Sequence, residues 1–283
     1  MQTLAEIKAM LAERGLRPRH ALGQNFLIDQ NLLRRLVESA QLKAGPLVLE
    51  VGPGTGTLTE ALLEAGARVI ACEMDRNLAA LLRERIPSLG YEARFRLIEG
   101  DCLETGKKVN RELISAIGEE PFVLVANLPY GAATPLMLSL LIDHPHCSRM
   151  AVTIQREVVD RLAAPHGSKD YGLLSIVAQA LARIEPLAKL PPECFWPRPD
   201  VTSAMVLLER RSDPLTREPR RLAAFAQTLF SKRRKQLGSI LGRDVPWPEG
   251  ITADQRPEEL SPTQVVMLME AVGEDLGDDT SEA

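Results

Sequence analysis

The sequence predicts an α/β protein whose mostly parallel, seven-stranded sheet is followed by a small all-α C-terminal domain. Between residues 47 and 155, short apolar runs alternate with segments of helical periodicity, and this order gives a parallel sheet with right-handed crossovers. Near residue 212 the composition turns polar, and no strand pattern occurs beyond it. We therefore expect two domains, residues 1–212 and 213–283.

Each element is predicted from a local pattern. Thr3 and Glu6 have the spacing of a capping box, which predicts a short first helix. The expected strands are apolar runs, the last two forming an antiparallel edge pair: 47–52, 67–75, 94–101, 122–127, 149–155, 183–190 and 201–210. The expected helices are 29–40, 57–64, 76–85, 111–117, 134–141, 156–163, 172–181, 219–230, 232–241 and 262–272.

The composition is that of a soluble globular protein, with 45% hydrophobic and 25% charged residues. No run of 18 apolar residues occurs and the first residues carry charges throughout, so we expect no membrane span, no signal peptide and a cytoplasmic location. The four cysteines are scattered and the four histidines share no ligand spacing. This pattern predicts free thiols and no metal site.

The charge is unevenly distributed along the chain. The net charge is −4, but residues 244–283 hold 11 acidic and 1 basic residue, so the remaining 243 residues carry +6. Residues 204–243 alone contain 10 Lys or Arg against 3 Asp or Glu. A solvated helix face could account for these cations, but their clustering favours a phosphate-binding surface.

Three glycines stand at one predicted strand-to-helix turn. Gly52, Gly54 and Gly56 have the spacing G-x-G-x-G, which lets the backbone approach a ligand closely. The dinucleotide fingerprint requires a third glycine at the position of Thr57, so a pyrophosphate is not expected. A tight structural turn is the alternative to a ligand-binding one.

Acidic residues close the next two predicted strands. Glu73 lies 21 positions after Gly52, where a carboxylate can accept both ribose hydroxyls of a nucleoside. Asp101 closes the third strand, where its carboxylate can accept a hydrogen bond from the exocyclic amine of adenine. Met74 and Cys102 flank these acids and are candidate adenine contacts. Because the carboxyl ends of parallel strands meet at one edge, these features predict a nucleoside-cofactor site.

The fourth strand ends in the sequence Asn127-Leu128-Pro129-Tyr130. An aromatic exocyclic amine is a poor nucleophile, and the Asn127 oxygen and the Leu128 carbonyl can each accept one of its N–H groups. Pro129 fixes the local φ angle, and Tyr130 can stack on a base. The predicted catalysis is orientation and hydrogen bonding of an amine acceptor.

This tetrapeptide resembles the Asn/Asp-Pro-Pro-Tyr signature of enzymes that methylate exocyclic amines, and the glycine pattern after Glu50 resembles class I S-adenosylmethionine-dependent methyltransferases. From about Arg19 to Val272 the chain resembles the ribosomal RNA adenine N6,N6-dimethyltransferases that modify small-subunit rRNA. The motifs are LGQNFL, GSKDYGLLSIVAQ, PPECFWPRPDVTSAMV, FSKRRKQLGSILG and RPEELSPTQVVML. The resemblance implies a Rossmann-like sheet, the cofactor S-adenosylmethionine and an RNA-binding C-terminal domain.

The resemblance also implies roles for individual residues. The implied cofactor residues are Gln24, Asn25, Leu27, Gly52, Gly54, Gly56, Glu73, Met74, Asp101, Cys102 and Asn127. The implied base-holding residues are Asn127, Leu128, Pro129, Tyr130 and Phe195, with Phe195 as the second stacking wall, and the implied RNA-binding residues are Arg198, Lys232, Arg233, Arg234 and Lys235. The implied substrate is two adjacent adenines in a 16S rRNA hairpin of the pre-30S particle, methylated by a monomer during ribosome biogenesis.

Two other functions fit parts of the sequence. A large-subunit rRNA methyltransferase of the macrolide-resistance type would share the NLPY core, but the segments RRKQLGSILG and EELSPTQ favour the small-subunit group. A non-catalytic assembly factor would not need the intact glycines and acids. One departure from the family pattern is Gly131-Ala132-Ala133, which stands where a polar residue, Ile and Ser are common.

Overall fold

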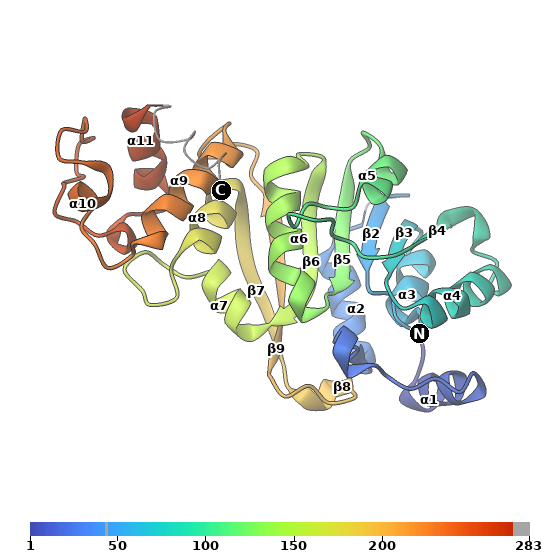
Figure 1. The fold of residues 1–283 in the computed structure, drawn as a ribbon. Helices are drawn as coiled ribbons and strands as arrows, with labels where there is room; N and C mark the ends of the chain where they lie inside the picture. The colour runs from blue at the N-terminus through green and yellow to red at the C-terminus, as the bar shows by residue number, and fades with distance from the viewer. Residues whose placement is uncertain (43–44, 274–283) are drawn as a thin grey trace. The chain divides into compact units, whose positions relative to one another are not determined.

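The computed structural model describes residues 1–42 and 45–273 (Figure 1). Its main sheet has seven strands in the order β4-β3-β2-β5-β6-β9-β7. The strands are β2 Leu47–Val51, β3 Arg68–Glu73, β4 Phe95–Glu99, β5 Phe122–Asn127, β6 Cys147–Gln155, β7 Ala182–Leu190 and β9 Ser203–Arg210. The sheet is parallel from β4 to β6, and β9 runs antiparallel to β6. The predicted α/β class with a mostly parallel seven-stranded sheet is confirmed.

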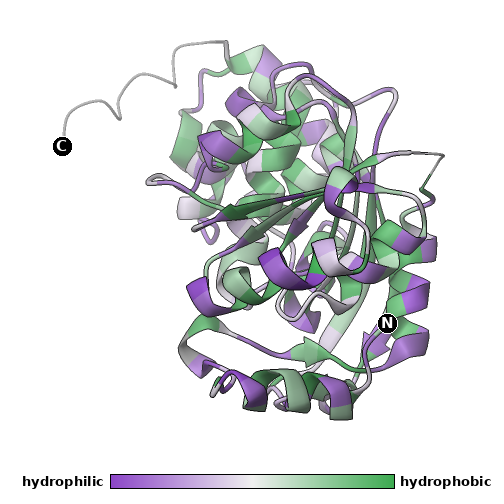
Figure 2. Cartoon of the chain, turned by 90° about the vertical axis from the view of Figure 1, so that its right-hand side faces the viewer, coloured by the Kyte–Doolittle hydropathy of each residue, from purple (hydrophilic) through white to green (hydrophobic). Residues whose placement is uncertain are grey.

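Helices connect the parallel strands and shield the sheet. The helices from the start of the chain to the end of β6 and just beyond it are α1 Leu4–Glu13, α2 Gln30–Ser39, α3 Thr57–Glu64, α4 Arg76–Ser88, α5 Arg111–Ile117, α6 Tyr130–Asp143 and α7 Arg156–Leu162. The core joins alternate strand residues such as Val48 and Val125 to Leu36 of α2 and Leu62 of α3. Figure 2 shows this as hydrophobic colour along the strands, with hydrophilic stretches on the helices.

A small two-stranded sheet was not predicted. β1 (Phe26–Leu27) pairs antiparallel with β8 (Phe195–Trp196), so that Leu27 lies opposite Phe195. The backbone N–H of Ile28 extends the pairing by donating to Cys194, at 2.9 Å. This pairing ties the N-terminal segment to a loop almost 170 residues away in the chain.

Three helices differ from the prediction by three residues or more at one end, and the other predicted helix ends agree within two residues. α6 begins at Tyr130 rather than 134, because Pro129 acts as its N-cap and Gly131 to Ala133 fill its first turn. α4 continues to Ser88, past the expected end at 85. The helix expected over 232–241 was wrong in its first half. Lys232 to Gln236 form turns, and α10 covers only Leu237–Leu241.

The chain forms two compact units. The first comprises Met1–Leu140, His144–Val159 and Glu185–Glu209, and the second comprises Leu141–Asp143, Asp160–Ile184 and the described residues from Arg210 on. In the second unit, α8 (Leu173–Leu181), α9 (Pro219–Ser231) and α11 (Pro262–Val272) pack together. The last change of unit falls close to the division expected at 212, but the second unit also takes an earlier segment. The last part of the acidic C-terminal segment, residues 274–283, lies outside the described residues.

No helix among the described residues is long and apolar enough to cross a membrane.

Candidate active site

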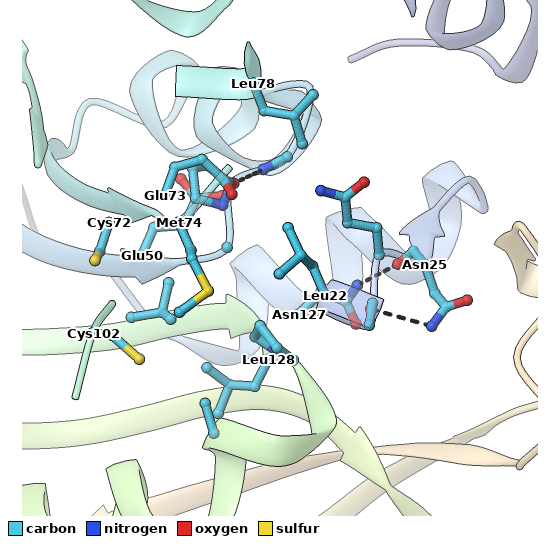
Figure 3. A pocket seen from close by; sticks show the side chains of 18 of the residues that line it. Leu22, Asn25, Glu50, Cys72, Glu73, Met74, Leu78, Cys102, Asn127 and Leu128 are labelled. Atoms are coloured by element: carbon cyan, nitrogen blue, oxygen red, sulfur yellow. Dashed lines mark hydrogen bonds between the residues drawn. The ribbon is translucent and has the colours of Figure 1, made fainter. Parts of the chain in front are cut away.

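A cavity of about 380 Å³ lies at the carboxyl ends of β2, β3, β4 and β5 (Figure 3). Its wall includes most residues that the sequence assigned to the cofactor and the acceptor. These are Gln24, Asn25, Leu27, Gly52, Gly54, Glu73, Met74, Asp101, Cys102, Asn127, Leu128, Pro129 and Tyr130. The predicted Gly56 and Phe195 are not in the wall. The fold thus gathers thirteen of the predicted residues around one space.

The glycine turn leaves no room for side chains. Gly52 and Gly54 have φ angles of 70° and 61°, which L-residues rarely adopt. A Cβ on Gly54 would lie 2.8 Å from the ring of Phe26, and one on Gly52 would lie 3.3 Å from Pro129. Gly56 has φ 90° and is the N-cap of α3, so its role is to turn the chain into that helix. The backbone itself therefore forms this wall of the cavity.

Two buried carboxyl groups lie behind the turn. Glu73 is 5% exposed and accepts hydrogen bonds from the N–H groups of Gly54, at 3.1 Å, and Asp75, at 2.8 Å. Burial raises the pKa of Glu73 to about 7 despite these bonds. Glu50 is 1% exposed and accepts from the Thr59 hydroxyl at 2.7 Å, and burial raises its pKa to about 8. A ligand that donates hydroxyl groups to Glu73 would stabilise its ionised form.

Sulfur-containing side chains line the cavity beyond Glu73 (Figure 3). Met74 is 47% exposed, an unusual position for a large apolar side chain and a suitable platform for a flat base. Cys72 and Cys102 are buried, and burial raises the pKa of both thiols, that of Cys102 to about 12. They therefore remain neutral. Asp101 is exposed at the rim, where its carboxylate accepts from the Leu103 N–H at 2.9 Å.

An N-terminal strap, residues 22–27, crosses the cavity and is held at both sides. The Gln24 amide donates to the carboxylate of Asp75 at 2.9 Å, next to Glu73. On the other side, the Asn127 amide donates to the carbonyl of Asn25 at 2.9 Å (Figure 3). The strap thus connects the end of β3 to the end of β5.

The bond to Asn25 also determines what Asn127 can do. Because its Nδ2 group donates to the strap, its Oδ1 atom is the free acceptor of the amide. Leu128 is 2% exposed, and its N–H donates to the Thr153 carbonyl at 3.0 Å, which holds the Asn127–Leu128 peptide directly before the Leu128 carbonyl. The site therefore offers two oxygen acceptors, one amide and one carbonyl, at the end of β5.

Tyr130 is held by a second strand. Its hydroxyl and that of Ser203 on β9 lie 2.9 Å apart in a hydrogen bond. Ser203 is fully buried, so its own position is rigid. Burial raises the pKa of Tyr130, and the phenol stays neutral. The ring of Tyr130 is thereby fixed at the cavity wall.

Phe195 does not face the cavity. It is 2% exposed and packs in the core, because its pairing with Leu27 in the small sheet turns its side chain inward. The aromatic ring that the sequence reasoning missed is Phe26, which lines the cavity and stacks on Trp196 with ring centroids 6.2 Å apart. Phe26 lies within the quoted LGQNFL motif, but only the β1–β8 pairing reveals its direction.

The expected RNA-binding cations fall into two groups. In the second unit, the Arg233 guanidinium donates to Glu258 at 2.5 Å and to the Lys169 carbonyl at 2.8 Å, so it joins two loops of that unit. Lys232, Arg234 and Lys235 are exposed, and no ion pair of theirs is found within the described residues. In the first unit, the side chain of Arg198 is 70% exposed.

A metal centre has no support in the part of the chain that the structure describes, where no group of three His, Cys, Asp or Glu side chains could hold an ion. The glycine turn, the carboxylate at the end of β3, the acidic residue after β4 and Asn127 at the end of β5 line one cavity, an arrangement typical of a nucleoside pocket at the edge of a parallel sheet. This combination of fold and site defines a class I S-adenosylmethionine-dependent methyltransferase.

Comparison with known proteins gives the family. The sequence model described as ribosomal RNA adenine dimethylase matches residues 15–271. A protein named ribosomal RNA small subunit methyltransferase A from Opitutus terrae is 38% identical over 91% of this chain and 94% of its own. One with the same name from Streptomyces avermitilis is 38% identical over 98% of this chain and 96% of its own. The chain belongs to the ribosomal RNA adenine dimethylase family.

Solved structures agree on the fold. A dimethyladenosine transferase from Plasmodium falciparum superposes with a TM-score of 0.72 at 23% identity, covering 86% of this chain and 95% of that one. The 23S rRNA methyltransferase ErmE gives 0.66 at 26% identity, covering 88% of this chain and all of its own.

Proposed function

We propose that this protein transfers methyl groups from S-adenosylmethionine to N6 of two adjacent adenines in a small-subunit rRNA hairpin, giving N6,N6-dimethyladenosine. The observation that carries the proposal is the orientation of Asn127, whose amide donates to Asn25 and leaves its oxygen as an acceptor beside the cofactor cavity. The names and coverage of the curated relatives support small-subunit rRNA as the substrate.

The residues of the cavity fit the cofactor. Glu73 would accept hydrogen bonds from the ribose hydroxyls, and Asp101 would accept one from the exocyclic amine of adenine. Met74 would lie against the adenine ring. The positive φ angles at Gly52 and Gly54, and the 2.8 Å approach of a Gly54 Cβ to Phe26, favour glycine at the turn, so its bare backbone can approach the ligand. When bound, the cofactor supplies an activated methyl group on a sulfonium, whose departure as a neutral thioether needs no metal or strong base.

The acceptor residues would work by orientation. The Asn127 oxygen and the Leu128 carbonyl each accept one N–H of the adenine amine, which favours a pyramidal nitrogen with its lone pair directed into the cavity. The ring of Tyr130, fixed by Ser203, stacks on the base and holds it flat. Once the methyl group is transferred, the nitrogen is positively charged and releases its proton readily.

A second methylation needs space for the first methyl group. Gly131 and Ala132 form the first turn of α6 beside Tyr130, and Ala132 lines the cavity. A Cβ on Gly131 would have nothing within 4 Å. These small residues would let a monomethylated amine rotate and present its remaining N–H to the Asn127 oxygen.

The exposed cations suit an RNA partner. Lys232, Arg234 and Lys235 form a basic turn in the second unit, and Arg198 is exposed in the first. Such side chains would contact phosphates, and their contribution would weaken with salt. We propose that the protein acts on the pre-30S particle as a monomer in the cytoplasm, during ribosome biogenesis.

Methyl transfer to isolated ribosomal subunits tests this function. Small subunits from cells that lack the modification are incubated with radiolabelled S-adenosylmethionine and either wild type or Asn127→Ala. We expect the substitution to lower kcat by about 100-fold, on the scale of losing one hydrogen-bonding group that orients a reaction, with cofactor affinity changed far less. Equal labelling by the two proteins would refute the acceptor role.

The choice of subunit is tested by repeating the assay with large subunits beside the small ones. ErmE, with which the fold superposes, is named for 23S rRNA. We expect label in small-subunit rRNA alone. Label confined to large-subunit rRNA would support the macrolide-resistance type of activity, and no label above background in either subunit would support a non-catalytic role.

A further inference from the structure

The first residues of the chain precede the segment that matches the family model, yet they contact the wall of the cofactor site. The family model begins at residue 15, after α1. Nevertheless Gln2, which precedes α1, is only 2% exposed, and α1 buries Ile7 and Leu11 against Leu78 of α4. Leu78 lines the cofactor cavity. A polar side chain that is this deeply buried needs partners, and those partners identify its role.

Gln2 uses its carboxamide on the turn that forms the cavity wall. Its Nε2 group donates to the Thr55 carbonyl at 2.8 Å, and its Oε1 atom accepts from the Thr57 hydroxyl at 3.0 Å. Both Thr55 and Thr57 line the cavity. Gln2 therefore binds the turn from the side opposite to the ligand space, once on each side of Gly56.

A buried ion pair holds the carboxamide in this orientation. The second N–H of Gln2 donates to Glu60 at 2.7 Å, and the same Glu60 oxygen accepts from Arg85 at 2.6 Å. Glu60 is 5% exposed, so its buried carboxylate oxygens need these hydrogen-bond partners. With both donors and the oxygen of Gln2 engaged, the amide cannot reverse without losing all three bonds.

The other hydrogen bonds of the turn come from its glycine N–H groups. Gly52 donates to the Cys72 carbonyl at 2.9 Å, Gly56 to the Pro53 carbonyl at 2.9 Å and Gly54 to the Glu73 carboxylate at 3.1 Å, so Gln2 supplies the bonds to the Thr55 carbonyl and the Thr57 hydroxyl. Because glycines are conformationally permissive, three in five positions would leave the turn free to adopt other shapes. A fixed carboxamide beneath the turn removes that freedom before the ligand binds.

We propose that Gln2 is a positioning residue that holds the glycine turn in the shape that receives S-adenosylmethionine. Residues that precede the family match thereby set the affinity for the cofactor. The inference rests on the proposed function only in the identity of the ligand. Gln2 acts through the Thr55 carbonyl and the Thr57 hydroxyl and does not itself line the cavity.

Calorimetric titration of the full chain with S-adenosylmethionine tests the inference. Gln2→Met keeps the length of the side chain and removes its hydrogen bonds. We expect Kd and KM for the cofactor to rise about tenfold, as expected for losing two hydrogen bonds that order the site, with kcat at saturating cofactor near that of wild type. Thr3→Ala is the matched control, because Thr3 caps α1 through Glu6 and makes no contact with the turn.

The outcomes separate this inference from the proposed function. A cofactor Kd within twofold of wild type in folded Gln2→Met, or an equal rise in Thr3→Ala, would overturn it. If Gln2→Met unfolds well below the Tm of Thr3→Ala, Gln2→Asn provides the second variant, because it keeps the amide but is too short to reach Thr55, and the same criteria apply. Failure of the wild type to bind the cofactor would overturn the proposed function as well.

Discussion

Cofactor affinity should depend on pH through one carboxyl group. Burial raises the pKa of Glu73 to about 7 in the free protein, and the carboxylate is the form that accepts two ribose hydroxyls. Lowering the pH through 7 protonates Glu73, so the ligand must displace a proton to bind. Affinity is therefore expected to rise with pH and to level off above 8.

The size of the effect follows from the fraction of Glu73 that is ionised. With a pKa of about 7, roughly one tenth is ionised at pH 6 and nine tenths at pH 8. Kd is then about tenfold higher at pH 6 than at pH 8, a difference of about 1.4 kcal/mol. Substitution of Glu73 by Gln should weaken binding at pH 8 and abolish the dependence on pH.

The assay is calorimetric titration at pH 6, 7 and 8 with 5′-deoxy-5′-methylthioadenosine. This nucleoside keeps the adenine and the ribose hydroxyls but lacks the amino-acid group, so the ligand itself does not titrate in this range. Glu73→Gln is the control that lacks the titrating carboxyl. A wild-type Kd that changes less than twofold between pH 6 and pH 8, or a Glu73→Gln protein with the wild-type slope, would refute the reasoning.

Three further predictions concern stability and positioning. Burial raises the pKa of Glu50 from its usual 4.5 to about 8, so the free energy of unfolding should fall by up to roughly 5 kcal/mol as pH rises from 4.5 to 8. Urea unfolding at several pH values should show this fall in wild type and a flatter dependence in Glu50→Gln. Ser203→Ala frees the Tyr130 hydroxyl and should lower kcat/KM for RNA about fivefold at unchanged cofactor Kd in methyl-transfer assays, and a value equal to wild type would contradict the anchoring role. Arg233→Ala should lower the free energy of unfolding, measured with urea, by about 2 kcal/mol, because Arg233 joins two loops through Glu258 and the Lys169 carbonyl. Lys232→Ala should lower it by less than about 0.5 kcal/mol, and equal losses in the two variants would contradict a structural role for Arg233.

The sheet and the cofactor half of the site could be predicted because their signals are local. Apolar runs of five or six residues define buried strands, and the residue that closes each parallel strand must reach the same edge. The same rule places Glu73 and Asp101 at that edge from the sequence alone. The same reasoning gave the class of the fold and the place of Asn127.

The acceptor half depends on contacts between distant parts of the chain. β1 and β8 have two residues each, too few for a periodic pattern, yet their pairing decides that Phe195 is buried and that Phe26 lines the cavity. The basic run at 232–235 precedes α10 and is not helical, and no local pattern showed this. Only the partners of Arg233 in other loops distinguish it from Lys232.

The Gly131-Ala132-Ala133 segment has a structural explanation that its composition did not suggest. Pro129 ends the strand-to-helix connection and begins α6, so the small residues form a helical turn rather than a loop. This places Tyr130 on the first turn of a helix, where Ser203 can fix its hydroxyl. The departure from the family pattern therefore leaves the position of Tyr130 well defined.

The most direct test of the account is mass spectrometry of rRNA after reaction with the purified protein. Small subunits from cells that lack the modification are treated with the protein and S-adenosylmethionine, and the digested rRNA is mapped nucleotide by nucleotide. The account predicts N6,N6-dimethyladenosine at two adjacent adenines of small-subunit rRNA, formed far more slowly with Asn127→Ala at matched reaction times. Monomethyladenosine alone would contradict dimethylation, and unmodified adenines throughout would contradict the central claim that this site methylates rRNA.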